Sequence, residues 1–341
     1  KFFDGNGYKL PDEVEDQLEE YVRQSADNEL PRPTGDGIGK IEHNSNLAHF
    51  YAHFVRHTID TSLEGMTIVY DGANGAASSV GPEILAGLGA KVININVNPD
   101  GLNINHHCGS THIEGLQVAV QQHNADLGIA NDGDADRCLL VDEKGQVLDG
   151  DQIMLLCALK LKEEGKLKDD TVVGTVMSNI GFHKAAQELG MKTFATAVGD
   201  RYVLEYMREH NLSVGGEQSG HVIFLDHNTT GDGMLTAVQV AALMKEKNQP
   251  LSELAGIMTK YPQVLINVRV ATKTGWEDND IIKAAIVTAE GELGVEGRVL
   301  VRASGTEPLI RVMAEGPNQE ALQALCQEIA DIIGREQGLA D

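Results

Sequence analysis

Short apolar runs alternate with amphipathic runs between residues 66 and 225, and this alternation restricts the chain to an α/β fold. The apolar runs are rich in β-branched residues and end in glycine or polar turns, as strands do. Because a helix-like run follows most of them, the strands are expected to form a mostly parallel sheet covered by helices. The expected strands are 66–75 (which runs into a glycine-rich turn), 91–97, 126–130, a strand after 137 with a turn at 142–145, 146–148, 171–177, 192–198 and 221–225.

The expected helices between these strands are 79–89, about 113–123, 151–165, 181–190, 200–210, about 232–246 and 251–258. From residue 263 onwards the order changes to β-α-β-β-α. Strands are expected at 263–270, 298–304 and 309–316, and helices near 278–293 and at 318–334. The last two strands are joined by a tight loop, which predicts antiparallel pairing in a small α+β domain.

These patterns divide the chain into three folded domains that follow an N-terminal segment. Residues 1–37 have little core, although 12–24 reads as an amphipathic helix and 30–39 as a proline- and glycine-rich linker. We expect two consecutive α/β domains with mixed, mostly parallel sheets at 38–148 and 149–258. An α+β domain is expected to follow at 259–341.

Charge and composition exclude several classes of partner. Of the 341 residues 42% are hydrophobic, which is enough to build folded cores. The 51 acidic and 27 basic residues give a formal net charge of −24, which argues against nucleic acid or an anionic membrane as the main partner. We find no signal peptide and no apolar run of the roughly 18–20 residues that a membrane span needs. Scattered cysteines without a CxxC pair predict reduced thiols in a cytoplasmic protein: Cys108, Cys138, Cys157 and Cys326.

The sequence NDGDADRCLL at 131–140 carries aspartates at every second position and an arginine directly after them. The loop follows an apolar strand, and α/β sheets bind ligands at the carboxyl ends of their strands. Carboxylates this close repel one another unless a cation lies between them. The small residues Gly133 and Ala135 allow them to converge, which favours Mg²⁺ held by three side chains: Asp132, Asp134 and Asp136.

Other interpretations of polar clusters are weaker. An EF-hand needs glycine where this chain has Arg137, and a helix where strand formers follow. A phosphatase motif with an aspartate nucleophile needs Thr or Val where Asp136 stands. A solvated acidic turn leaves the adjacent arginine unexplained. A zinc site is conceivable without support from paired spacing, with the ligands His106, His107, Cys108 and His112.

Three further loops carry polar side chains that suit a phosphorylated sugar. In RASGTEPLIR (302–311), arginines, hydroxyls and a freed backbone amide suit a tetrahedral dianion. In GGEQSGH (215–221), carboxylate and hydroxyl groups at alternate positions suit vicinal sugar hydroxyls. VGDRYVLE (198–205) opens a helix, whose N-terminus favours anions or polar ligands. An ordinary hairpin, turn or helix cap remains an alternative for each loop taken alone.

Taken together, DGDADR, VGDRYVLE, GEQSGH and RASGTEPLIRV resemble the α-D-phosphohexomutase superfamily in order and spacing, over essentially the whole chain. Ala135 stands where many members have glycine, a change that need not disturb the ligands. VGDRYVLE and SGTEPLIRVMAEG lean towards the members that act on glucosamine phosphates. The alternatives are a phosphomannomutase/phosphoglucomutase and a non-catalytic protein that binds sugar phosphate or metal.

The resemblance implies a four-domain fold and assigns roles to particular residues. The three aspartates hold Mg²⁺, and Arg137 helps to neutralise the phosphoryl group that is transferred. Lys1 matches a lysine proposed as an acid/base group. Groups that contact the sugar are Gly199, Asp200, Arg201, Glu217 and Ser219, with His221 nearby. Apart from the resemblance, Ser178 is a further candidate for substrate binding, because GTVMSN (174–179) ends a strand at the carboxyl edge of the sheet. The phosphate that does not react is held by the last loop, at Arg302, Ser304, Gly305, Thr306 and Arg311.

The resemblance also implies a reaction, the interconversion of glucosamine 6-phosphate and glucosamine 1-phosphate through a phosphoserine and a 1,6-bisphosphate. Glucosamine or glucose 1,6-bisphosphate is the expected activator, and a hexosamine phosphate is the expected partner. The family's serine lies in an S-H-N-P string that these residues do not contain. We therefore expect residues 1–37 to be the remnant of a first domain and the chain to lack turnover. A homo-oligomer is compatible with the complete protein.

Overall fold

The computed structural model describes residues 2–26, 30–44, 46–304 and 307–338. It divides into two compact units, which are described separately below. Unit 1 comprises Lys1–Val176 and Phe194–Ala255, and unit 2 comprises Met177–Thr193 and Gly256–Asp341. No helix among the described residues is both long and apolar enough to span a membrane.

The first sheet of unit 1 has the strand order β2-β1-β3-β4-β5. Its two edges differ, because β1 pairs in parallel with β2 and β3, whereas β4 pairs antiparallel with β3 and β5. Helices α3 (Val80–Gly87) and α4 (Glu114–His123) connect the parallel strands. The strands are β1 (Thr67–Asp71), β2 (Lys91–Ile95), β3 (Leu127–Asn131), β4 (Cys138–Asp142) and β5 (Val147–Leu148).

The second sheet has the order β7-β6-β8-β9, in which β6 and β8 run parallel and β9 is antiparallel to β8. Helix α7 (Asp200–Glu209) packs against β6 and β8 through its buried Val203 and Met207. The mixed pairing in both sheets confirms the predicted class of α/β domain. The strands are β6 (Thr171–Thr175), β7 (Lys192–Thr196), β8 (Val214–Gly216) and β9 (Val222–Phe224).

Two buried helices complete the core of unit 1. Helix α8 (Gly233–Lys247) is buried on all sides from Gly233 to Met244, and it contacts β3, β4 and α5 (Gly150–Glu163). A helix that is apolar all round belongs in an interior of this kind. Asp232 caps α8 by accepting a 2.9 Å hydrogen bond from the backbone N–H of Leu235. The short helix α9 (Leu251–Leu254) follows.

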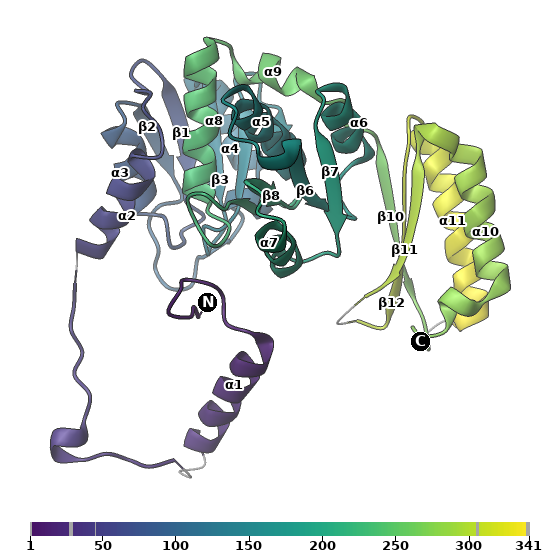
Figure 1. Cartoon of the computed structure of the whole chain (residues 1–341), viewed down its shortest axis with the longest axis horizontal. Helices are drawn as coiled ribbons and strands as arrows, with labels where there is room; N and C mark the ends of the chain where they lie inside the picture. The colour runs from purple at the N-terminus through teal and green to yellow at the C-terminus, as the bar shows by residue number, and fades with distance from the viewer. Residues whose placement is uncertain (1, 27–29, 45, 305–306, 339–341) are drawn as a thin grey trace. The chain divides into compact units, whose positions relative to one another are not determined.

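Unit 2 contains a three-stranded antiparallel sheet of order β10-β12-β11. Helices α10 and α11 lie side by side on one face of it (Figure 1). The covered face is apolar, and β10 accordingly alternates buried and more exposed side chains. This is the predicted α+β domain. Its elements are β10 (Gln263–Arg269), α10 (Asp280–Leu293), β11 (Arg298–Ala303), β12 (Leu309–Glu315) and α11 (Gln319–Gln337), and α6 (Ile180–Glu188) lies in the same unit.

The N-terminal segment contains α1 (Asp12–Ala26), as predicted for 12–24, and contacts the rest of unit 1 just before that helix. Phe3 and Lys9 form an isolated antiparallel bridge. The carbonyl of Gly7 accepts a hydrogen bond from the Thr229 hydroxyl. The guanidinium of Arg208, on α7, lies 3.8 Å from the centroid of the Tyr8 ring.

Two elements were not predicted from the sequence. Helix α2 (Asn46–Arg56) precedes β1, and strand β8 lies between α7 and β9. The predicted helix 251–258 is also shorter than expected, because α9 passes into a 3₁₀ turn at Ala255–Ile257. The other predicted helices and strands occur within a few residues of their expected bounds.

Candidate functional site

The aspartate loop connects β3 to β4 in a tight turn that its own backbone stabilises. The Asp132 carbonyl accepts a 3.1 Å hydrogen bond from the Ala135 N–H, and an Asp132 carboxylate oxygen lies 3.3 Å from the Arg137 backbone nitrogen, which donates to it. Ala135 has a φ of 60°, in the left-handed region that glycine adopts more readily than other residues. Asp134 is exposed, and the other two aspartates are half-buried.

Hydrogen bonds from buried polar groups stabilise this loop. The Tyr70 hydroxyl donates to the Asn131 side-chain oxygen over 3.0 Å, and the Asn131 side-chain amide donates to the Arg137 carbonyl over 2.8 Å. On the other side, Gly233 at the start of α8 donates its N–H to the Ala135 carbonyl over 3.0 Å. A Cβ on Gly233 would collide with the Asn131 side chain and the Arg137 carbonyl. These contacts therefore fix the backbone conformation of the loop.

Three of the predicted motifs meet at His221, which is only 3% exposed. Its Nε2 atom lies 3.6 Å from a carboxylate oxygen of Asp136 and 3.5 Å from one of Asp200. His221 and Arg137 also form an isolated antiparallel bridge, supported by the hydrogen bond from the Cys138 N–H to the Gly220 carbonyl. The aspartate loop, the start of α7 and the turn before β9 therefore form one site in unit 1.

Glu217 occupies the turn between β8 and β9 and faces the start of α7. Its carboxylate accepts a 3.1 Å hydrogen bond from the backbone N–H of Gly199, whose φ is 134°. Burial raises the pKa of Glu217, and the negative charges of Asp200 and Asp136 raise it further, against the lowering effects of the Gly199 N–H and Arg137. A half-buried carboxylate of this kind is suited to accept hydrogen bonds from neutral hydroxyls.

The remaining predicted groups of unit 1 lie around this centre. Ser219 is exposed at the tip of the β8–β9 turn. Arg201 pairs with Glu205 one turn along α7, with 2.8 Å between Nε and the carboxylate. The Nε atom of Arg137 is buried and has no hydrogen-bond acceptor among the residues that the structure describes. An anionic oxygen at Arg137 would satisfy it.

The chemistry of the aspartate loop fits a divalent cation. The pKa of Asp132 is raised first by burial and then by the negative charge of Asp136, so these two carboxylates already repel each other. A cation between them would offset that repulsion, and the carboxylate oxygens are the ligands that Mg²⁺ prefers. Within the described ranges, however, no group of three or more His, Cys, Asp or Glu side chains is placed to hold a metal. The three-aspartate metal site therefore stays a prediction.

The predicted phosphate loop belongs to unit 2. Arg302 and Arg311 are partners in the register of β11 and β12, and the pKa of Arg302 is lowered by burial and by the charge of Arg311. The Ser304 hydroxyl is placed to accept a 3.4 Å hydrogen bond from the Glu307 N–H. The Nε of Arg311 is buried without an acceptor in the described part of the chain. Two close guanidinium groups of this kind favour a bound dianion.

The other predicted residues are placed as follows. Ser178 is buried and belongs to unit 2. Lys1, Gly305 and Thr306 lie outside the described residues. The described residues among 106–112 do not form a metal centre. The rings of His106 and His107 are tilted by 59°, with their centroids 4.4 Å apart.

Sequence reasoning missed three supporting residues. Asn131 and Tyr70 hold the aspartate loop, and Lys273 donates a 2.8 Å hydrogen bond to the Ser304 carbonyl of the phosphate loop. Asn131 had a signal, because a polar side chain at the buried end of an apolar strand needs a partner. Lys273 had none, since it lies in an ordinary polar segment.

Family models define the class of protein to which this site belongs. Residues 48–145 match phosphoglucomutase/phosphomannomutase α/β/α domain II, residues 149–261 match α/β/α domain III, and residues 265–332 match the C-terminal domain. Solved structures share the fold. A phosphoglucomutase/phosphomannomutase family protein from Burkholderia thailandensis aligns with a TM-score of 0.75 at 20% identity, over 95% of this chain and 71% of the other.

Similar curated proteins identify the family within this class. Phosphoglucosamine mutase from Symbiobacterium thermophilum is 55% identical over 338 residues, which are 98% of this chain and 75% of the relative. The Bacillus subtilis enzyme is 49% identical over 339 residues, with 99% and 75% covered. The chain therefore belongs to the phosphoglucosamine mutase family, and it spans about three quarters of the length of these relatives.

Proposed function

We propose that this site serves the reversible conversion of glucosamine 6-phosphate to glucosamine 1-phosphate. The observation that carries the proposal is the meeting of Asp136, Asp200 and His221 in a chain 55% identical to a phosphoglucosamine mutase. A phosphoserine gives its phosphoryl group to the free sugar oxygen and makes a 1,6-bisphosphate, which then returns the other phosphoryl group. Positioning and charge stabilisation account for most catalysis of this type.

We assign Mg²⁺ to Asp132, Asp134 and Asp136. When bound, the ion supplies positive charge to the phosphoryl oxygens. The raised pKa of Asp132 and the proximity of Asp136 support this assignment. A structure of the Aspergillus fumigatus N-acetylphosphoglucosamine mutase, 23% identical to this chain, holds GlcNAc-6P and magnesium. Arg137, whose Nε has no acceptor among the described residues, is assigned to the transferring phosphoryl group.

The sugar is assigned to the groups around Glu217. The half-buried carboxylate of Glu217 and the exposed hydroxyl of Ser219 are positioned on one turn to accept from and donate to vicinal hydroxyls. The other groups that we assign to the sugar are Ser178, Gly199, Asp200, Arg201 and His221. Its phosphate is assigned to the last loop, at Arg302, Ser304, Gly305, Thr306 and Arg311, and Lys1 is retained as an acid/base candidate.

The partners follow from this chemistry. We propose a hexosamine phosphate as substrate and glucosamine or glucose 1,6-bisphosphate as activator. The charge of −24 supports the absence of nucleic acid and of an anionic membrane surface among the partners. Four buried free cysteines support a reducing, cytoplasmic location. A homo-oligomer of the complete protein is compatible with these assignments.

The polypeptide of these 341 residues is expected to bind glucosamine 6-phosphate without turning it over, because it contains no S-H-N-P string to carry the phosphoryl group. Isothermal titration in the presence of Mg²⁺ measures binding, with glucose and mannose 6-phosphates as comparisons of sugar preference. A coupled mutase assay with added bisphosphate measures turnover. Turnover above the rate of the enzyme-free control would contradict the prediction, and absence of saturable binding would contradict the proposed function.

Replacement of Glu217 by glutamine is expected to weaken sugar-phosphate binding by about 10- to 100-fold, the loss typical of a hydrogen bond to a charged group. The same change should raise the unfolding free energy at pH 7. The folded-state pKa of Glu217 is raised, so its charged form destabilises the fold above that pKa, and this penalty disappears as pH falls below the ordinary glutamate range. Titration and thermal unfolding at several pH values measure both effects.

Glu209→Gln provides the matched control, because Glu209 is exposed at the last residue of the same helix that Asp200 begins. Glu209→Gln should leave the sugar-phosphate affinity and the pH dependence of the unfolding free energy unchanged. A Glu217→Gln variant that binds as tightly as the parent chain would remove Glu217 from the sugar site.

A further inference from the structure

Glu315 is a fully buried carboxylate at the last residue of β12, far along the strand from the phosphate loop. It accepts hydrogen bonds from the Arg298 Nε over 2.8 Å, from the backbone N–H of Ile180 over 2.9 Å and from the Asn179 side-chain amide over 3.3 Å. Burial raises its pKa in spite of these donors. Burial of this charge therefore lowers the stability of the fold, and apolar side chains of similar volume would be less destabilising in the same space.

Arg298 connects this carboxylate to the segment that carries Ser178. It lies opposite Glu315 in the register of β11 and β12. While its Nε contacts Glu315, its Nη2 donates a 2.6 Å hydrogen bond to the backbone carbonyl of Ser178. The planar guanidinium fixes these two contacts relative to each other, which a lysine could not do.

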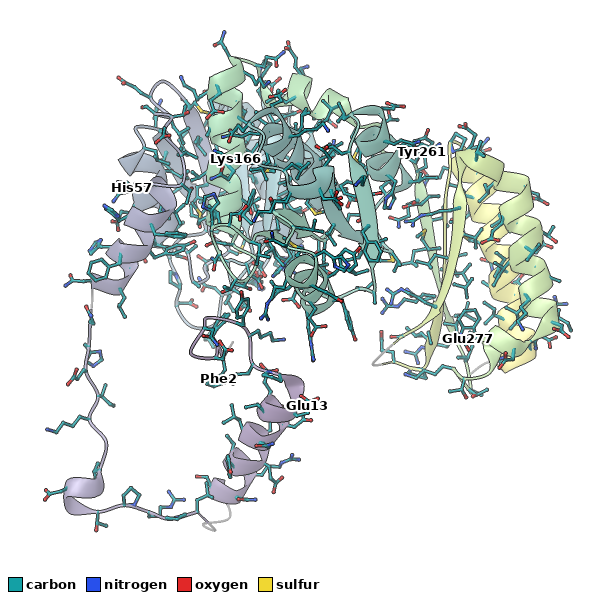
Figure 2. The ribbon with its side chains drawn as sticks, viewed as in Figure 1. Phe2, Glu13, His57, Lys166, Tyr261 and Glu277 are labelled. Atoms are coloured by element: carbon teal, nitrogen blue, oxygen red, sulfur yellow. The ribbon has the colours of Figure 1, made fainter. Side chains whose placement is uncertain are left out.

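Asn179 adds a second connection within unit 2. Its side-chain oxygen accepts from the Tyr261 N–H over 3.0 Å, and its side-chain amide donates to the Tyr261 carbonyl over 3.0 Å. The same oxygen caps α6 by accepting from the Gly181 N–H over 3.0 Å. Tyr261, labelled in Figure 2, lies just before β10 and packs its ring 4.4 Å from the Lys184 ammonium. The segment 178–181 is thus held by the end of the C-terminal sheet.

The same two strands carry the phosphate-binding arginines at their other end. Arg302 and Arg311 are register partners, as are Arg298 and Glu315 four residues away along each strand. At about 3.3 Å per residue, this spacing places the two pairs roughly 13 Å apart on a short antiparallel ribbon. A tilt of the ribbon at one end therefore displaces the other.

We propose that Glu315 and Arg298 are positioning residues that couple the Ser178 segment to the strands that bind the substrate phosphate. The proposal rests on the proposed function, since it assumes that Ser178 and the last loop hold the same sugar phosphate. A buried charged network gives one preferred geometry, whereas an apolar contact would permit sliding. The network therefore fixes the position of the Ser178 segment relative to β11 and β12, which carry Arg302 and Arg311.

Glu315→Gln in the 341-residue chain tests this role. Loss of the charge weakens the hydrogen bonds that Arg298 and Ile180 both donate to Oε2, and an amide nitrogen in that position leaves both without an acceptor. An amide nitrogen in the position of Oε1 leaves Asn179 without its acceptor instead. Hydrogen exchange followed by mass spectrometry should show the Ile180 amide exchanging about 10-fold faster or more, with β10 and α11 unchanged. Titration with glucosamine 6-phosphate should show affinity lowered by about 5- to 10-fold. Arg298→Lys should give intermediate values, because it keeps the charge and only one of the two contacts.

Asp331→Asn is the control, because Asp331 accepts a 2.8 Å hydrogen bond from Gln327 on the exposed face of α11 in the same unit. It should change neither measurement. Faster exchange throughout 263–337 would show a merely structural role for Glu315 and overturn the proposal. Unchanged affinity in Glu315→Gln would also overturn it, whereas failure of the unsubstituted chain to bind sugar phosphate would overturn the proposed function instead.

Discussion

Replacement of Asp134 by asparagine is expected to lower magnesium-dependent mutase turnover by about 100-fold or more. A bound cation supplies several kcal/mol of charge stabilisation to phosphoryl transfer, and each 1.4 kcal/mol corresponds to about a factor of ten. Turnover is measured in a polypeptide that joins these residues to a phosphoserine segment, at several Mg²⁺ concentrations. In the 341-residue chain itself, titration with Mg²⁺ should show weakened binding.

Asp134 is the most informative of the three aspartates. It is exposed, and its carboxylate makes no hydrogen bond to any residue that the structure describes, whereas Asp132 accepts one from the Arg137 N–H. The substitution therefore removes a ligand and leaves the loop geometry in place. Asp16→Asn, on the exposed side of α1, makes the same change of charge elsewhere and should be neutral. A normal rate and normal Mg²⁺ dependence in Asp134→Asn would eliminate its role in metal binding.

Replacement of Gly150 by alanine is expected to lower sugar-phosphate affinity by more than about 10-fold and to destabilise the fold by about 1–3 kcal/mol. Gly150 opens α5 and donates its N–H to the Gln218 carbonyl over 2.9 Å. A Cβ there would collide with the Glu217 carbonyl and lie 2.7 Å from the Gly220 nitrogen. These are backbone atoms, so no rotamer change relieves the collision, and the turn that carries Glu217 must move.

Titration with glucosamine 6-phosphate and urea unfolding measure the two effects. Gly115→Ala is the matched control, because Gly115 lies in α4 and a Cβ there meets nothing within 4 Å. That substitution should leave binding unchanged and stabilise the fold by up to about 1 kcal/mol. An equal response of Gly150→Ala and Gly115→Ala would show that the β8–β9 turn does not depend on close packing against α5.

Most secondary structure could be predicted because its signals are local. Short apolar runs between amphipathic runs predicted β1, β3, β6 and β12, with bounds correct to within a few residues. Strand β8 was missed because two of its three residues are glycines, which weaken strand propensity. Those glycines are required by packing, since a Cβ on Gly216 would collide with the His221 carbonyl and one on Gly215 would lie 2.8 Å from the Met207 sulfur.

Helix α2 was missed because its stability comes from distant partners. Only Ala52 and Val55 are buried, whereas Leu47, Phe50 and Phe54 are exposed, so little of the helix's apolar surface is covered. The helix packs against α3 and α8, and the Tyr51 hydroxyl donates a 2.7 Å hydrogen bond to Asp232, which caps α8. No pattern within residues 46–56 indicates contacts with residues so far away in the sequence.

The sequence by itself determined most of the elements, apart from α2 and β8, and the three candidate loops of unit 1 with their chemical types. Strand and helix periodicity and the choice of carboxylate, hydroxyl and guanidinium groups are properties of the local sequence. Only the tertiary structure decided that Asp136 and Asp200 both face His221 and that Glu217 caps the start of α7. It also decided that Asn131 and Gly233 hold the aspartate loop. These contacts join residues far apart in the chain, and their geometry depends on how the sheets pack on α5 and α8, which no single segment specifies.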